Sequence, residues 1–126
     1  MCFIDADVVL ESSALHKVIA AHKGGLLSVF AYQLQQSVGE RLTVPVMNWF
    51  LLSALPFITI EKFPHKEMVA AMGAFMCFSR TSYDAISGHA AVKNVLVEDM
   101  ALAQLMKERG QKVQTFVSRG LISVRM

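Results

Sequence analysis

Two acidic pairs, Asp5 with Asp7 and Glu98 with Asp99, are the residues whose type and spacing could support chemistry. The first pair directly follows the apolar run 1–4, which predicts a buried strand. Side chains two positions apart share one face of an extended chain, so both carboxylates could bind one hard cation, Mg²⁺ or Mn²⁺. Aspartates also occur in turns, where they make local hydrogen bonds, and this alternative stays open.

The second pair begins the clearest helical pattern of the chain. Leu102, Leu105 and Met106 form the apolar stripe of this predicted helix. Acidic residues are favoured at helix N-termini, so capping by itself explains Glu98 and Asp99. A carboxylate at a helix start can also point into a cleft and accept a proton there, although the helix dipole lowers its basicity.

The elements that must position these residues alternate between helix and strand. We expect a helix within 11–25, an apolar strand within 25–33, a second strand within 70–80 and a short helix over 81–88. Thr81 and Asp84 in the short helix have the spacing of a capping box. Two short strands are expected around 112–117 and 121–126. A chain of 126 residues and 13.9 kDa fits one α/β domain.

The segment 42–60 contains no charged residue and lies between Glu40-Arg41 and Glu61-Lys62. Pro45 and Pro56 disfavour one straight helix, because each removes a backbone donor. We therefore expect a bent segment that lies in or near a membrane interface. A buried core helix is the alternative interpretation.

Composition restricts the class of protein. Hydrophobic residues make up 54% of the chain and charged residues 17%, with a mean hydropathy of +0.44, which is more apolar than an average soluble domain. The formal charge of +2 is not gathered into a basic cluster, which argues against nucleic acid as a partner. Cys2 and Cys77 lie in apolar runs and are expected to be reduced core residues of a cytosolic protein.

The order of "FIDADV", "GAFMCFSRTSYDAISGHAAV" and "VLVEDMALAQLMKERGQKV" resembles the family-two glycosyltransferases, inverting enzymes with the GT-A nucleotide-sugar fold. The similarity covers nearly the whole chain and is strongest to the membrane-associated branch that acts on carotenoid-like and hopanoid-like lipids. It implies an α/β partial GT-A domain, a mixed sheet with flanking helices. Residues 1–126 would be the catalytic and acceptor half, with a membrane-proximal segment at 42–60, at the cytoplasmic face of the cell membrane.

The resemblance also implies a role for each acidic residue. Asp7 would bind Mg²⁺ or Mn²⁺ directly, and Asp5 would lie nearer the metal-bound donor's ribose and phosphates. Asp99 would be the general base that takes a proton from the acceptor, supported by Glu98. The expected donor is a nucleoside-diphosphate sugar with uridine as base, and the expected acceptor is a lipid-like hydroxyl or carboxyl.

Gly88 and His89 match a Gly-Gly-His-like turn that lies near the sugar in that family. A main chain without side chains would allow the donor to approach closely there. Ser87 stands where the family usually has the first glycine, which is a departure from the pattern. The family also places a nucleotide-binding half before the Asp-x-Asp strand. That half is missing here, so we expect the isolated chain to be a fragment, inactive or very weak.

Two other interpretations remain. "FIDADVVL" also fits the opening motif of haloacid-dehalogenase-like phosphohydrolases, in which Asp5 would be the nucleophile and Asp7 the acid/base. The third interpretation is an inactive remnant or a membrane-surface interaction module that keeps the acidic motifs without a working donor site.

Overall fold

The computed structural model describes residues 1–54 and 57–124, which form a mixed α/β fold. The main sheet has four strands, in the order β1 (Cys2–Ile4), β5 (Phe75–Phe78), β3 (Leu26–Phe30) and β6 (Val113–Val117). Strand β5 runs antiparallel to both β1 and β3, whereas β3 and β6 are parallel. The expected mixed sheet is therefore confirmed.

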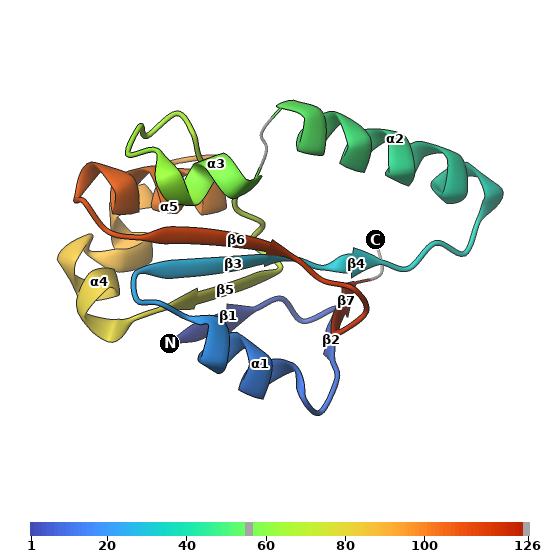
Figure 1. The fold of residues 1–126 in the computed structure, drawn as a ribbon, viewed down its shortest axis with the longest axis horizontal. Coiled ribbons are helices and arrows are strands. Elements are labelled where there is room, and N and C mark those ends of the chain that lie inside the picture. Colours follow the sequence, from blue (N-terminus) through green and yellow to red (C-terminus); the bar gives the residue numbers. More distant parts are fainter. Residues whose placement is uncertain (55–56, 125–126) are drawn as a thin grey trace.

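A second, smaller sheet lies beyond the end of the main one (Figure 1). Its order is β2 (Val8–Leu10), β7 (Ile122–Val124) and β4 (Tyr32–Gln33). The single strand expected within 25–33 is divided at Ala31 between the two sheets. Strand β2 was not expected, because three apolar residues are too short to show a period in the sequence.

Helices cover both faces of the main sheet (Figure 1). Helix α1 (Ala14–Ala21) lies on one face, and α3 (Phe57–Lys62) and α5 (Glu98–Glu108) lie on the other. Helix α4 (Arg80–Ala85) and the 3₁₀ helix η1 (Gly88–Val92) connect β5 to α5. These helices confirm the expected ones, but the capping box of Thr81 and Asp84 does not form. Helix α4 already begins at Arg80, whose Nε donates to Asp84 Oδ2 at 3.1 Å.

Alternation along the strands divides the core between the two faces. Leu26, Met76 and Phe78 pack on the side of α5, whereas Leu27, Phe75 and Cys77 pack on the side of α1. Successive side chains of a strand point to opposite faces, so each strand contributes to both clusters. Both faces of the main sheet are buried for this reason.

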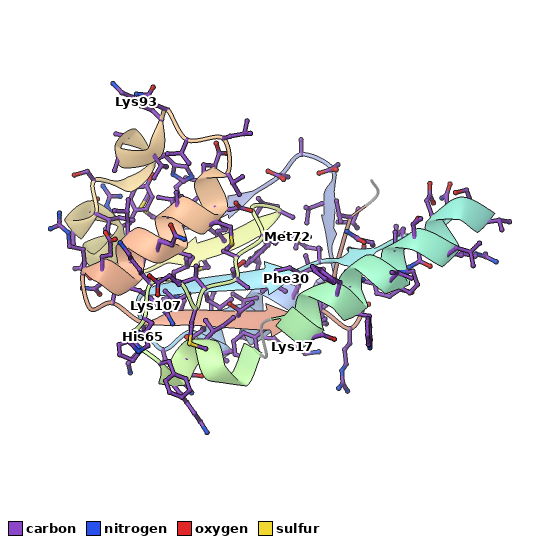
Figure 2. The ribbon with its side chains drawn as sticks, turned by 90° about the horizontal axis from the view of Figure 1, so that it is seen from above. Lys17, Phe30, His65, Met72, Lys93 and Lys107 are labelled. Carbon is purple, nitrogen blue, oxygen red and sulfur yellow. The ribbon has the colours of Figure 1, made fainter. Side chains whose placement is uncertain are left out.

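The connection from α3 to β5 crosses the α5 face as irregular but buried backbone. Val69, Ala70 and Ala71 are buried there, and side chains from neighbouring elements bind the backbone. Lys107 Nζ donates to the carbonyls of Ile60, Phe63 and Met68 at 2.5, 2.6 and 2.8 Å. Figure 2 shows Lys107 beside the segment that carries His65.

Two strand residues hold the rest of this connection. Thr115 Oγ1 donates to the carbonyl of Ala70 at 2.6 Å, and Ser28 Oγ accepts the Met72 N–H at 2.9 Å. Buried backbone polar groups need such partners, because an unpaired one is costly. The connection thereby reaches Gly73 and β5 in a defined position.

Helix α2 (Val38–Ala54) extends away from the rest of the fold (Figure 1). It begins with a capping box, since Glu40 N–H donates to Ser37 Oγ and Ser37 N–H donates to Glu40 Oε2, both at 3.1 Å. None of its described side chains is buried, so the interpretation of 42–60 as a buried core helix is wrong for this part. Within 1–54 and 57–124, no helix is long and apolar enough to cross a bilayer.

The expectation that a proline bends the segment 42–60 is not met at Pro45. Pro45 lies inside α2, and the helix continues through it. A proline there removes one hydrogen bond, to the carbonyl of Arg41, and that residue is exposed, so water can replace the lost donor. Pro56 lies outside the described residues.

Candidate functional site

An open cleft of about 530 Å³ lies where the end of β1, the start of α5 and the helix η1 meet. Four of the predicted site residues line it: Asp5, His89, Glu98 and Asp99. They come from both acidic motifs and from the Gly-His turn, which are far apart in the sequence. The fold therefore brings these residues to one place.

Asp5 reaches the cleft because β1 ends there in a tight turn. The Asp5 N–H donates to the Ala74 carbonyl at 3.2 Å, and the Val8 N–H donates to the Asp5 carbonyl at 3.1 Å. The second bond closes a turn across Ala6 and Asp7 and begins β2. Both aspartates are exposed, but the described lining of the cleft includes Asp5 and not Asp7.

Asp99 is held tightly by backbone donors. Its Oδ2 accepts the Gly73 N–H at 2.9 Å, and its Oδ1 accepts the Met100 N–H at 2.7 Å. The first bond ties the start of α5 to the buried connection, which fixes the direction of the carboxylate. A carboxylate has about four acceptor positions, so two remain for a ligand. Glu98 precedes it and is exposed at the rim of the cleft.

His89 is oriented by Tyr83. The Tyr83 hydroxyl accepts the backbone N–H of His89 at 3.2 Å and lies 2.7 Å from His89 Nδ1. In the tautomer in which the hydroxyl gives its own proton to Nδ1, the ring proton is on Nε2. The Phe3 ring packs against both residues, with centroids 4.6 Å from His89 and 5.3 Å from Tyr83. In that tautomer His89 can present an N–H donor to the cleft from an aromatic cluster.

Gly88 has a different role from the one expected. It is buried, and a Cβ at this position would lie 2.3 Å from Cζ of Tyr83. The close approach that needs glycine is thus made by the Tyr83 ring. Ser87 adopts φ 61°, in the left-handed region that favours glycine.

The site could take a cation only together with a ligand. Among residues 1–54 and 57–124, no three His, Cys, Asp or Glu side chains are grouped to hold a metal ion. Mg²⁺ is commonly held by one or two carboxylates and by substrate phosphates, for which Asp5 at the cleft and Asp7 in the adjoining turn are the candidates. Three carboxylates and no Lys or Arg line the described cleft, so a cation would be needed to hold a diphosphate there.

Sequence reasoning missed Tyr83 and Gly73. Tyr83 lies within the short helix expected over 81–88, and its spacing of six from His89 corresponds to no regular helical contact. Gly73 touches Asp99 only because the connection before β5 crosses the sheet. Comparison of the sequence with protein-family models and curated proteins, and of the fold with solved structures, gives no match.

Proposed function

We propose that this chain carries the acceptor side of the active site of an inverting glycosyltransferase. It would transfer a sugar from a uridine-diphosphate donor to a lipid-like hydroxyl or carboxyl. The observation that carries the proposal is that Asp5 and Asp99, from two separate acidic motifs, line the same cleft. Neither motif alone supports it, because each has a structural explanation.

Asp99 is the proposed general base. An acceptor hydroxyl beside it gives its proton to the carboxylate as the acceptor oxygen attacks the anomeric carbon. The sugar–phosphate bond breaks on the opposite face, and the configuration inverts. The bonds from Gly73 and Met100 hold the carboxylate in place before the acceptor arrives, which favours catalysis by orientation.

The donor side would use Asp5, Asp7 and His89. A divalent cation, when bound, neutralises the charge of the leaving diphosphate. Asp5 and Asp7 would hold it from the turn after β1. The Nε2–H of His89 can donate to a sugar hydroxyl or a phosphate oxygen, and Tyr83 keeps it available.

The rim of the cleft favours an apolar acceptor. Val95, Leu96 and Val97 precede α5 and are 46%, 98% and 52% exposed, and Ile4 on the other side is 41% exposed. Leu96, Val97 and Ile4 also line the cleft. Apolar side chains exposed at a polar site are typical of contacts with an apolar ligand.

Helix α2 supports attachment to a membrane surface, proposed at the cytoplasmic face. Its exposed apolar residues recur three and four positions apart and form one stripe: Val38, Leu42, Val46, Trp49 and Phe50. Such a helix can lie in the interface with its apolar stripe among the acyl chains. The same stripe would also bind a membrane surface if the chain were an interaction module without a working donor site.

The donor site is tested by Mn²⁺ with UDP-glucose in an NMR titration. We expect paramagnetic broadening of the amide signals of both 5–7 and 98–100, since both segments border one cleft. Asp5→Asn should abolish the broadening. Glu108→Gln is the matched control, because it removes one charge at the far end of α5, from a surface pair with Lys66.

Broadening that is absent, or that survives Asp5→Asn, would contradict the donor site. In any preparation that transfers sugar, Asp99→Asn should abolish transfer and keep Mn²⁺–UDP-glucose binding. Loss of both would mean that Asp99 is only structural.

Membrane attachment is tested with Trp49, the only tryptophan of the chain, which is 71% exposed. Its fluorescence should shift to shorter wavelength when anionic phospholipid vesicles are added. Val46→Asp, on the stripe, should prevent the shift, whereas Asn48→Asp adds the same charge away from the stripe and should not. Vesicle binding without Mn²⁺–UDP-glucose binding would favour the interaction module.

A further inference from the structure

Cys2 and Cys77 face one another across β1 and β5. They are direct partners in the antiparallel register, and their Sγ atoms are 2.7 Å apart. The adjacent pair, Met1 and Phe78, exchanges both backbone hydrogen bonds at 2.7 Å. The cysteines therefore occupy the non-hydrogen-bonded position, where Cα atoms are about 4.5 Å apart. This separation lies in the range that a disulfide spans.

The two thiols differ in exposure, which contradicts the expectation that both are core residues. Cys2 is exposed, whereas Cys77 is buried with Leu27 and Phe75 on the α1 face of the sheet. Burial, with the hydrogen bond to Cys2 and the charge of Cys2, raises the pKa of Cys77 to about 12. Cys2 is thus the thiol that a reagent in solution reaches first, and Cys77 is held protonated behind it.

We propose that Cys2 and Cys77 form a reversible disulfide that fastens β1 to β5 in the presence of a small-molecule disulfide such as glutathione disulfide. The proposal does not depend on the glycosyltransferase assignment. It rests on the register of the two strands, the contact of the two sulfurs and the exposure of one of them.

The reaction is a two-step thiol–disulfide exchange. The Cys2 thiolate attacks one sulfur of glutathione disulfide, forms a mixed disulfide and releases one glutathione thiolate. Cys77 then loses its proton and attacks Cys2 Sγ, which forms the intrachain bond and releases the second glutathione thiolate. The two protein thiols are oxidised by two electrons, glutathione disulfide is reduced to two glutathiones, and the two thiol protons go to the released thiolates.

Formation of the mixed disulfide at Cys2 makes Cys77 easier to deprotonate for the second step. The hydrogen bond and charge that Cys2 contributes to the raised pKa of Cys77 disappear once its sulfur is in a mixed disulfide. Only the contribution of burial then opposes ionisation of Cys77. The attacked sulfur is already its neighbour, so little movement of the strands is needed.

The disulfide would act on the strand that leads to the cleft. Within the described residues β1 pairs only with β5. It carries Phe3 and Ile4 of the lining and leads directly into Asp5. The bond itself would lie on the α1 face, opposite Phe3. Oxidation is thus expected to hold β1 in place without entering the cleft.

The test equilibrates the purified chain in glutathione redox buffers, followed by acid quenching, alkylation and intact-mass measurement. We expect a monomer with no alkylated cysteine and a mass lower by two hydrogens, restored by dithiothreitol. A cross-link between residues so distant in the chain should raise Tm by roughly 10 °C. Circular dichroism of the reduced chain verifies that it is folded.

A second variant separates register from simple thiol reactivity. Cys2→Ser with Ile4→Cys keeps an exposed thiol on the same strand, but opposite Phe75 instead of Cys77. Diagonal positions are about 7–8 Å apart, so this variant should stop at the glutathione adduct. The proposal is overturned if the original chain also stops at the adduct, stays reduced or forms only intermolecular dimers, or if the variant forms the bond equally well.

Discussion

The two faces of the main sheet are stabilised in different ways. On the α5 face, side chains bind individual backbone groups of the buried connection: Lys107, Thr115, Ser28 and Asp99 all do so. On the α1 face, Ala14 and Val18 pack against Leu27, Val29 and Phe75. The polar contacts there bind the end of α1 instead of a buried connection: Gln114 accepts the Lys23 N–H at 2.8 Å and donates to the Ala21 carbonyl at 3.3 Å. Hydrogen bonds are directional, whereas apolar packing is not.

The difference teaches where a site can be positioned accurately. A directional hydrogen bond fixes the positions of both its donor and its acceptor. At the cleft, the bond from the Gly73 N–H to Asp99 Oδ2 does this. The α1 face contributes mainly buried area, which stabilises the fold without orienting a ligand-binding group. Both the proposed base and the oriented histidine accordingly lie on the polar face.

The largest loss in the free energy of unfolding should come from Lys107→Met. Lys107 is only 8% exposed, and its removal leaves three carbonyls without their donor. We expect a loss of about 3 kcal/mol or more in the free energy of unfolding, measured by urea denaturation. Lys66→Met is the control, because its ion pair with Glu108 is exposed and should contribute less than about 0.5 kcal/mol. Equal losses in both variants would mean that the bonds of Lys107 to the buried connection stabilise the fold no more than a surface ion pair does.

Next in size is Asp99→Ala compared with Asp5→Ala. The first leaves the N–H groups of Gly73 and Met100 without acceptors and should cost about 2 kcal/mol of unfolding free energy. The second removes an exposed carboxylate and should stay within about 0.5 kcal/mol. Thermal and urea unfolding measure both. If Asp5→Ala cost as much as Asp99→Ala, Asp5 would be structural and its availability to a cation doubtful.

On the α1 face, Cys77 should make the free energy of unfolding of the reduced chain depend on pH, with a smaller effect than the two above. Its pKa is raised from 9.0 to about 12 in the folded state, so between these values the unfolded chain binds fewer protons. Stability should therefore fall as pH rises through this window, by about 1 kcal/mol between pH 8 and pH 10. Urea unfolding of Cys77→Ala at both pH values should lack this part of the decline; an unchanged slope would contradict it.

The smallest effect, and of opposite sign, is expected from Ser87→Gly. Ser87 has φ 61°, a conformation that costs an L-residue roughly 1–2 kcal/mol, whereas glycine adopts it freely. Part of the gain is lost to the entropy of glycine in the unfolded chain, so we expect stabilisation of about 0.5 kcal/mol. Thermal unfolding measures it, and destabilisation would mean that the Ser87 side chain matters to the turn before Gly88.

Patterns within one element were predictable from the sequence. The stripe of Leu102 and Met106 identified α5, and apolar runs identified β3 and β5, because these patterns reflect which side of an element is buried. The capping box of Ser37 and Glu40 was also present in the sequence and would have located the start of α2. The acidic pairs were candidates for a site on residue type and spacing alone.

Contacts between distant segments were decided only by the tertiary structure. The fold set Asp99 against Gly73, Tyr83 against Gly88 and His89, and Cys2 against Cys77. It also divided one expected strand between two sheets and allowed α2 to continue through an exposed proline. Local periodicity determines which residues an element buries, but strand pairing and the path of a connection depend on the packing of the whole chain, and these decide which polar atoms meet.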